Sequence, residues 1–213
     1  MFGATGFTGK LVVAALHALG VRDPVLGGRH EDRLQALATR YGGCETGVGD
    51  GRRPDTLPAR VRGAHVVVDT AGPFLELGEP VVRASIEAGA HFIDTTGEQA
   101  YMARVLERYH GAAKLKKLAV VNGHAFEFAI GYCVASQLAD WDHEIDTIDV
   151  FNRVAGFGSS RGTRKSAIGA LMEEALVRRE GRLVRRGLSP VPMRVRMPEA
   201  EAVELAVPFP GGE

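Results

Sequence analysis

The sequence has little cysteine, no excess of either charge and no long apolar run. Cys44 and Cys133 are too few and too far apart for a disulfide framework or a zinc site, so we expect no metal and a reducing, cytoplasmic location. The 26 Lys and Arg equal the 26 Asp and Glu in number, which argues against nucleic acid as the main partner. No stretch approaches the ~20 apolar residues of a membrane span, so we expect none.

The first part of the chain alternates amphipathic stretches with short β-rich runs. Apolar residues recur at helical spacing in residues 11–19, 34–41, 81–86 and 101–109, and the β-rich runs fall at 24–27, 65–70, 91–95 and 118–122. Such alternation is typical of βαβ units. It predicts an α/β fold with a doubly wound parallel sheet of the Rossmann type.

The remainder of the chain has a different pattern. Residues 145–154 alternate like a strand, and residues 168–176 carry one apolar face at helical spacing. We expect this part to belong to an α+β second domain. Its basic run, from Arg178 to Arg186, is typical of a solvated face.

A glycine-rich turn at the front is the most informative motif. The sequence from Gly3 to Gly9 spells GxxGxxG and opens the first predicted helix. Glycine allows a pyrophosphate to approach the backbone, and a helix N-terminus offers free N–H groups and a positive dipole end. The motif therefore predicts a dinucleotide clamp, with a plain strand-to-helix turn as the alternative. The cofactor-binding residues expected here are Gly3, Thr5, Gly6, Phe7, Thr8 and Gly9.

The end of the second predicted strand indicates which dinucleotide the chain binds. An NAD site needs an acidic residue there, whereas this sequence has Arg29, whose planar guanidinium suits a 2′-phosphate. We therefore predict NADP. Arg33, one turn into the next helix, either assists Arg29 or is an ordinary surface residue. Asp50 either lies near the adenine or belongs to a plain Gly-Asp-Gly turn.

Three later loops also follow strand ends, where ligands of open α/β sheets bind. The loop with Ala71, Gly72 and Pro73 combines small residues with a rigid proline and is expected at the nicotinamide half. Glu98 is either a substrate-contacting catalytic residue or part of a helix N-terminus. His124 is a candidate proton donor by position, with a structural role as the alternative.

These motifs together resemble the saccharopine dehydrogenase-like reductases, NADP-binding oxidoreductases that include trans-acting enoyl reductases. The matching segments are GATGFTGKLV at 3–12, GGRHEDRL at 27–34, DTAGPFLELGEPVV at 69–82, AGAHFIDTTGE at 88–98 and, less specifically, SRGT at 160–163. The resemblance implies pyrophosphate at the glycine-rich turn, the 2′-phosphate at Arg29 and the nicotinamide side at Gly72 and Pro73. One departure is that GHAFEF at 123–128 stands where the family has a GFD-type turn, so the substrate class is not carried over.

The resemblance is strongest in residues 1–125, which we expect to form the NADP-binding domain. Residues 126–213 are expected to be an incomplete substrate or dimerisation domain. Only Met1 and Phe2 precede the glycine-rich turn, where a strand needs ~5 residues, so we expect a fragment that lacks most of its first strand and folds marginally.

The expected function is hydride transfer between NADP(H) and a C=C, C=N or C=O group of a small or acyl substrate. A short-chain dehydrogenase is excluded because no Tyr is followed four residues later by Lys. A semialdehyde reductase needs a cysteine nucleophile, and neither cysteine has an evident base. A non-catalytic module that binds NADP and senses redox state is the alternative from another functional class. The expected partner is a small-molecule substrate, and the sequence leaves open whether the chain forms a homodimer.

Overall fold

The computed structural model describes residues 1–21, 23–154, 158, 175–186, 192–197 and 203–206. Helices and strands alternate through the first 121 residues, as the sequence predicts. Their order is α1 (Phe7–Ala18), β1 (Leu26–Gly28), α2 (Glu31–Arg40), β2 (Thr46–Val48), a 3-10 turn (Pro54–Thr56), α3 (Pro58–Val61), β3 (Val66–Asp69), α4 (Phe74–Glu87), β4 (His91–Asp94), α5 (Gln99–Leu115) and β5 (Val120–Val121).

All the strand pairs of this part are parallel. β1 pairs with β2, and β4 lies between β3 and β5. Phe2 joins the two groups, because it forms parallel bridges to both Gly27 and Asp69. The resulting order, β2-β1-Phe2-β3-β4-β5, is the 3-2-1-4-5-6 order of a doubly wound dinucleotide-binding sheet. The prediction of a Rossmann-type fold is confirmed.

The first strand is as short as the sequence predicts, yet its central position is filled. The Phe2 amide donates to the Val68 carbonyl at 2.6 Å, and the Thr70 amide donates to the Phe2 carbonyl at 3.1 Å. On the other side, the Gly27 amide donates to the Met1 carbonyl at 2.7 Å. The Phe2 side chain is 5% exposed and belongs to the hydrophobic cluster around Val67 and Phe92, so it packs into the core at this central position.

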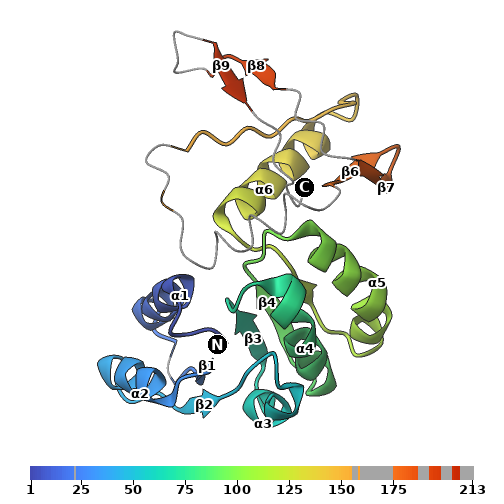
Figure 1. The fold of residues 1–213 in the computed structure, drawn as a ribbon. Helices are drawn as coiled ribbons and strands as arrows, with labels where there is room; N and C mark the ends of the chain where they lie inside the picture. The colour runs from blue at the N-terminus through green and yellow to red at the C-terminus, as the bar shows by residue number, and fades with distance from the viewer. Residues whose placement is uncertain (22, 155–157, 159–174, 187–191, 198–202, 207–213) are drawn as a thin grey trace.

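The helices pack in two groups, each with its own hydrophobic cluster (Figure 1). α1 and α2 pack with β1 around Val13, Leu26 and Leu34. α3, α4 and α5 pack with β3 and β4, where the largest buried residues include Phe92 and Tyr101. The positions predicted from helical spacing are the buried ones in α2 and α4, since the core-facing stripe of a helix repeats every three to four residues.

The described residues beyond β5 comprise one helix and two hairpins: α6 (Phe126–Trp141), β6 (Ala175–Arg179), β7 (Arg182–Arg186), β8 (Met193–Val195) and β9 (Glu204–Ala206). β6 pairs antiparallel with β7 and β8 with β9. Arg153 forms an ion pair with Glu204 at 2.8 Å.

Two sequence expectations are corrected in this part. Residues 145–154 form no strand, and Ala175 and Leu176, expected at the end of a helix, begin strand β6. The cause is the turn after β6, where Glu180 and Gly181 both adopt positive φ, of 49° and 74°. Two such residues make the turn that closes a tight hairpin. The rest of the expected helix and the SRGT segment lie outside the described residues.

Candidate functional site

The glycine-rich turn joins Phe2 to α1 and is held from two sides. Gly3 has a φ of +73°, and a Cβ there would come within 2.8 Å of the Thr70 hydroxyl oxygen. A Cβ on Gly9 would come within 2.1 Å of the Gly3 carbonyl oxygen, so α1 packs directly on the turn. Both positions therefore need glycine, for backbone conformation and for close packing respectively.

The N-terminus of α1 is open toward an anion. Its N-cap is Gly6, no side chain caps it, and its first turn carries no acidic residue. The first turn of a helix carries N–H groups without intrahelical partners and the positive end of the helix dipole. This arrangement fits a pyrophosphate, as the sequence predicts.

Thr70 ties the loop after β3 to the glycine-rich turn. Its hydroxyl donates to the Phe2 carbonyl at 3.0 Å and lies 3.3 Å from the Gly3 carbonyl. Thr70 falls inside a quoted motif, but its role was not predicted. Its partners lie 67 and 68 residues away in the chain, so spacing along the sequence could not reveal them.

A cavity of about 450 Å³ opens between these loops. It brings together most of the predicted cofactor-binding residues, namely Gly3, Thr5, Gly6, Phe7, Thr8, Arg29, Arg33, Asp50, Ala71 and Gly72. Its lining also includes residues that were not predicted, namely Phe2, Gly28, His30, Gly49, Gly51, Thr70, Leu77 and Val81. Four predicted site residues do not line it: Gly9, Pro73, Glu98 and His124.

Backbone forms much of the β1–β2 end of this cavity. A Cβ on Gly51 would come within 2.6 Å of the Leu77 carbonyl, and one on Gly49 within 2.8 Å of the Phe2 ring. Asp50 shapes this turn, because its carboxylate accepts from the Arg52 amide at 3.0 Å. Asp50 is thus a turn residue that also lines the cavity, and its place near the adenine stays a prediction.

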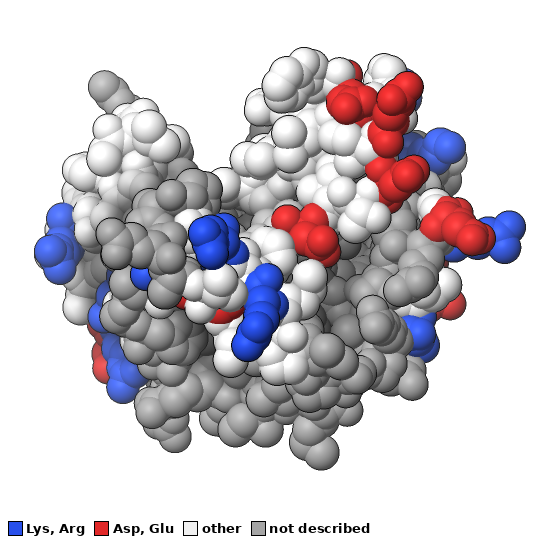
Figure 2. Space-filling model, turned by 90° about the horizontal axis from the view of Figure 1, so that it is seen from above, with Lys and Arg blue, Asp and Glu red and all other residues white. Residues whose placement is uncertain are grey.

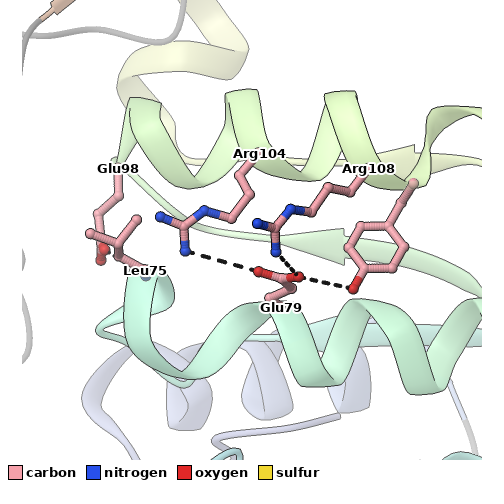
Figure 3. A network of polar contacts seen from close by, with 6 residues as sticks. Leu75, Glu79, Glu98, Arg104 and Arg108 are labelled. Carbon is pink, nitrogen blue, oxygen red and sulfur yellow. Dashed lines mark hydrogen bonds and ion pairs between the residues drawn. The ribbon is translucent and has the colours of Figure 1, made fainter.

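Glu98 holds the start of α4. Its two carboxylate oxygens accept hydrogen bonds from the amides of Phe74 and Leu75, at 2.9 and 2.8 Å, and the residue is 7% exposed. Figure 3 shows the Glu98 side chain next to Leu75. These amides directly follow the cis peptide between Gly72 and Pro73. Glu98 thus fixes the end of the loop that lines the cavity, without lining the cavity itself.

Glu79, which lies on α4, is a second carboxylate that joins α4 to α5. Glu79 accepts hydrogen bonds from Arg108 at 2.8 Å and from Tyr109 at 3.1 Å, and Arg104 approaches it at 3.9 Å (Figure 3). Partial burial disfavours the charge on Glu79, but the hydrogen bonds from Arg108 and Tyr109 outweigh it and keep the pKa of Glu79 below its usual value. This network stabilises the packing of the two helices that Glu98 also connects.

Two buried aspartates lie in register at the carboxyl ends of β3 and β4. Asp94 accepts hydrogen bonds from the amides of Thr96 and Gly123 and from the Asn122 side chain. Asp69 accepts from the Ala71 amide at 2.8 Å, while its other oxygen, Oδ2, is buried and has no hydrogen-bond partner among the described residues. Burial raises the pKa of both carboxyls, that of Asp69 to about 7.

His124 follows β5 and is exposed. Its amide donates to the Asp94 carbonyl at 2.8 Å, so its backbone is fixed at the same sheet edge. The structure thus places the two predicted catalytic residues differently: Glu98 is buried and hydrogen-bonded to the start of α4, and His124 is exposed after β5.

Basic and acidic side chains both lie on the face shown in Figure 2, so the described part of that face carries no continuous basic surface. Within the described ranges, no helix is long and apolar enough to cross a membrane. Those ranges also contain no group of three potential metal ligands.

Comparison with known proteins identifies relatives. The chain is 27% identical to a lipid droplet localized protein of Caenorhabditis elegans over 240 residues, covering 100% of this chain and 56% of that protein. It is 34% identical over 118 residues to a trans-acting enoyl reductase of Mycobacterium bovis, covering 53% of this chain and 28% of that protein. The chain therefore spans about half of the first relative's length and less than a third of the second's.

Among solved structures, the chain superimposes on apo saccharopine dehydrogenase (L-Glu forming) from Saccharomyces cerevisiae with a TM-score of 0.63. The match covers 97% of this chain and 48% of that one at 16% identity, so it shows a shared fold. The sequence model described as the saccharopine dehydrogenase NADP binding domain matches residues 1–123, and it confirms the prediction of NADP as the cofactor. The chain belongs to the saccharopine dehydrogenase NADP-binding domain family.

Proposed function

We propose that the chain is the cofactor-binding part of an NADP(H)-dependent oxidoreductase. The observation that carries the proposal is the composition of one cavity. The open N-terminus of α1, the guanidinium groups of Arg29 and Arg33, and the loop with Ala71 and Gly72 all line it. Such a lining offers backbone N–H groups to a pyrophosphate, two Arg side chains to a 2′-phosphate and a small-residue loop to the nicotinamide half.

In this proposal the residues have separate tasks. Gly3, Gly6, Phe7 and Thr8 bind the pyrophosphate through the backbone, and Gly9 keeps α1 close to the turn. Bound NADPH supplies a hydride, which we propose goes to a C=C, C=N or C=O group of a small or acyl substrate.

Glu98 acts in the proposal as a positioning residue. Its carboxylate already accepts from two amides of α4, so its contribution is to hold the loop before Pro73 in place. His124 is proposed as the proton donor to the reduced substrate, because it is exposed and its backbone is fixed beside the loop after β4. We also propose that residues 1–125 form the NADP-binding domain and that residues 126–213 contribute to substrate binding or dimer formation in the cytoplasm.

A non-catalytic NADP-sensing module is the second candidate. It is favoured by one observation: neither Glu98 nor His124 lines the cavity. Oxidation of NADPH in the presence of carbonyl, imine or enoyl compounds distinguishes the two functions. Turnover supports the reductase, whereas NADPH binding without turnover of any of the three classes supports the module.

The test of the cofactor site compares NADPH with NADH. A charge-assisted contact to phosphate is worth roughly 1.5 to 3 kcal/mol, so Arg29→Ala should weaken NADPH about ten- to a hundred-fold and leave NADH unchanged. Arg62→Ala, which removes an exposed arginine beyond α3, is the matched control and should change neither. Equal losses for both cofactors in Arg29→Ala would show that the 2′-phosphate does not bind there.

A further inference from the structure

A second cavity of about 450 Å³ lies between α1 and α2. It is lined by Thr5, Lys10, Arg33, Ala36, Leu37, Arg40 and Tyr41. Only Thr5 and Arg33 also line the cofactor cavity, so the two cavities adjoin. The other five residues of the α1–α2 cavity do not line the cavity described above.

The spacing of the residues explains how α2 builds one wall. Arg33, Leu37 and Arg40 are four and three residues apart, which places them on one face of the helix over two turns. Lys10 contributes from α1 on the other side. Two helices thus direct three cationic side chains and an apolar surface toward the same space.

The charges of this cavity are all of one sign. Lys10, Arg33 and Arg40 line it, and no carboxylate does. Within the described part of the chain, none of these three forms an ion pair; the salt bridges there involve Arg104, Arg108 and Arg153 instead. A cavity lined by cations without counter-charges concentrates anions, because one sign of potential is focused inside it.

The remaining lining is apolar and aromatic. Leu37 and Ala36 supply aliphatic surface, and Tyr41 supplies a ring. The Arg40 guanidinium lies 5.8 Å from the centre of that ring, a cation–π distance that holds Arg40 beside the cavity. An anion that fits this lining carries an apolar body as well as its charge.

We propose that the α1–α2 cavity is a second ligand site, which binds a phosphate monoester with an aromatic or aliphatic body. The phosphate is held by Lys10, Arg33 and Arg40, and the body lies on Leu37 and the Tyr41 ring. Arg suits this task because its planar fork pairs with phosphate oxygens. Because Arg33 also lines the cofactor cavity, this ligand and NADPH share one cation and weaken each other's binding.

The test uses phenyl phosphate as the probe and calorimetric titration of the 213-residue chain in a phosphate-free buffer of low ionic strength. We expect saturable binding of phenyl phosphate, weaker binding of inorganic phosphate and none of phenol. The double variant K10Q/R40Q keeps two methylenes of each stem, removes both charges and should weaken phenyl phosphate about tenfold or more. The control R62Q/K114Q removes two exposed cations elsewhere and should not change it.

Equal weakening in both double variants would overturn the proposal, because it would mean attraction by overall charge. So would inorganic phosphate binding as tightly as phenyl phosphate. Unfolding midpoints of both variants are measured alongside, and since all four residues are exposed we expect them to match the parent.

Titration with NADPH separates this site from the cofactor site. Excess NADPH should raise the Kd of phenyl phosphate to a plateau, and phenyl phosphate should raise the Kd of NADPH by the same factor. K10Q/R40Q should leave NADPH binding alone unchanged. If that variant weakens NADPH but not NADH, the cavity is an extension of the 2′-phosphate site and the proposal is wrong. If the chain binds no NADPH, the proposed function fails, while the phenyl phosphate titrations still decide the second site.

Discussion

Replacing Asp69 by Asn tests how much the buried charge at the carboxyl edge of the sheet lowers the free energy of unfolding. Asp69 is 0% exposed, and burial is the main reason that its pKa rises from 3.8 to about 7. The hydrogen bond from Ala71 opposes the rise, the nearby Asp94 carboxyl adds to it, and the Met1 amino group opposes it. A shift of about 3 pKa units corresponds to about 4 kcal/mol, because each unit is worth about 1.4 kcal/mol.

The sign of the pH dependence of stability follows from which state, folded or unfolded, binds the proton of Asp69 more tightly. The folded state holds the proton of Asp69 up to about pH 7, whereas the unfolded chain loses it near pH 4. The free energy of unfolding therefore falls as pH rises from about 4 to 7, and the full penalty applies above pH 7. The Asn variant has no such penalty, although its side-chain NH2 would be buried where Oδ2 now lies without a partner among the described residues, at a cost of about 1 to 2 kcal/mol.

Urea unfolding at steps from pH 4.5 to 8.5 measures the effect. We expect D69N to be about 2 kcal/mol more stable than the parent above pH 7, with the advantage lost in acid. Asp55 is exposed, so D55N is the matched control and should follow the parent at every pH. A difference between D69N and the parent that does not change with pH would refute this reasoning.

Three further substitutions test the turn, the central strand position and the α4 N-terminus. A Cβ on Gly9 would lie 2.1 Å from a backbone oxygen, so G9A should abolish NADPH binding in a fluorescence titration, while G111A, where a Cβ meets open space, should keep it. Equal effects of the two would contradict the packing argument. Phe2 is 5% exposed and Phe7 72%, so F2A should cost about 3 to 5 kcal/mol in urea unfolding and F7A under about 1 kcal/mol. A small loss in F2A would mean that Phe2 does not stabilise the sheet. E98Q leaves one amide oxygen for two N–H donors, so it should raise the Kd of NADPH and lower stability by about 1 to 3 kcal/mol. An unchanged Kd would show that the loop does not depend on Glu98.

Most elements of the first 121 residues could be predicted because their signals are local, whereas the 3-10 turn and α3 were not predicted. Helical spacing of apolar residues placed α2, α4 and α5, and the short apolar run at 65–70 placed β3. The region around Ala175 could not be predicted in this way, since a short apolar group fits either a helix or a strand. The positive φ of Glu180, a residue that is not glycine, decided in favour of the hairpin.

In the candidate site, too, the features with a local sequence signal could be predicted and the others could not. Residues proposed to bind through the backbone, such as Gly3 and Gly6, could be predicted to line the cavity because glycine itself is the signal. Thr70 and the true partners of Glu98 were not found, because a side chain's contact with a backbone group 24 or 68 residues away leaves no local pattern. The sequence indicated where the loops end, and only the fold shows what fixes them.

The carboxyl edge of the sheet connects stability with the expected function. Asp94 holds the loops after β4 and β5, and Asp69 holds the loop after β3; both do so by accepting backbone N–H bonds. Those bonds favour the charged carboxylates, whereas burial favours the neutral forms. For Asp69, protonation below about pH 7 therefore increases global stability while it weakens the bond that shapes the loop with Ala71, which lines the cofactor cavity. The charged Asp69 that holds this loop most strongly is therefore present above about pH 7, whereas the free energy of unfolding is greatest well below that pH. We expect the affinity for NADPH to rise with pH across the range in which the free energy of unfolding falls.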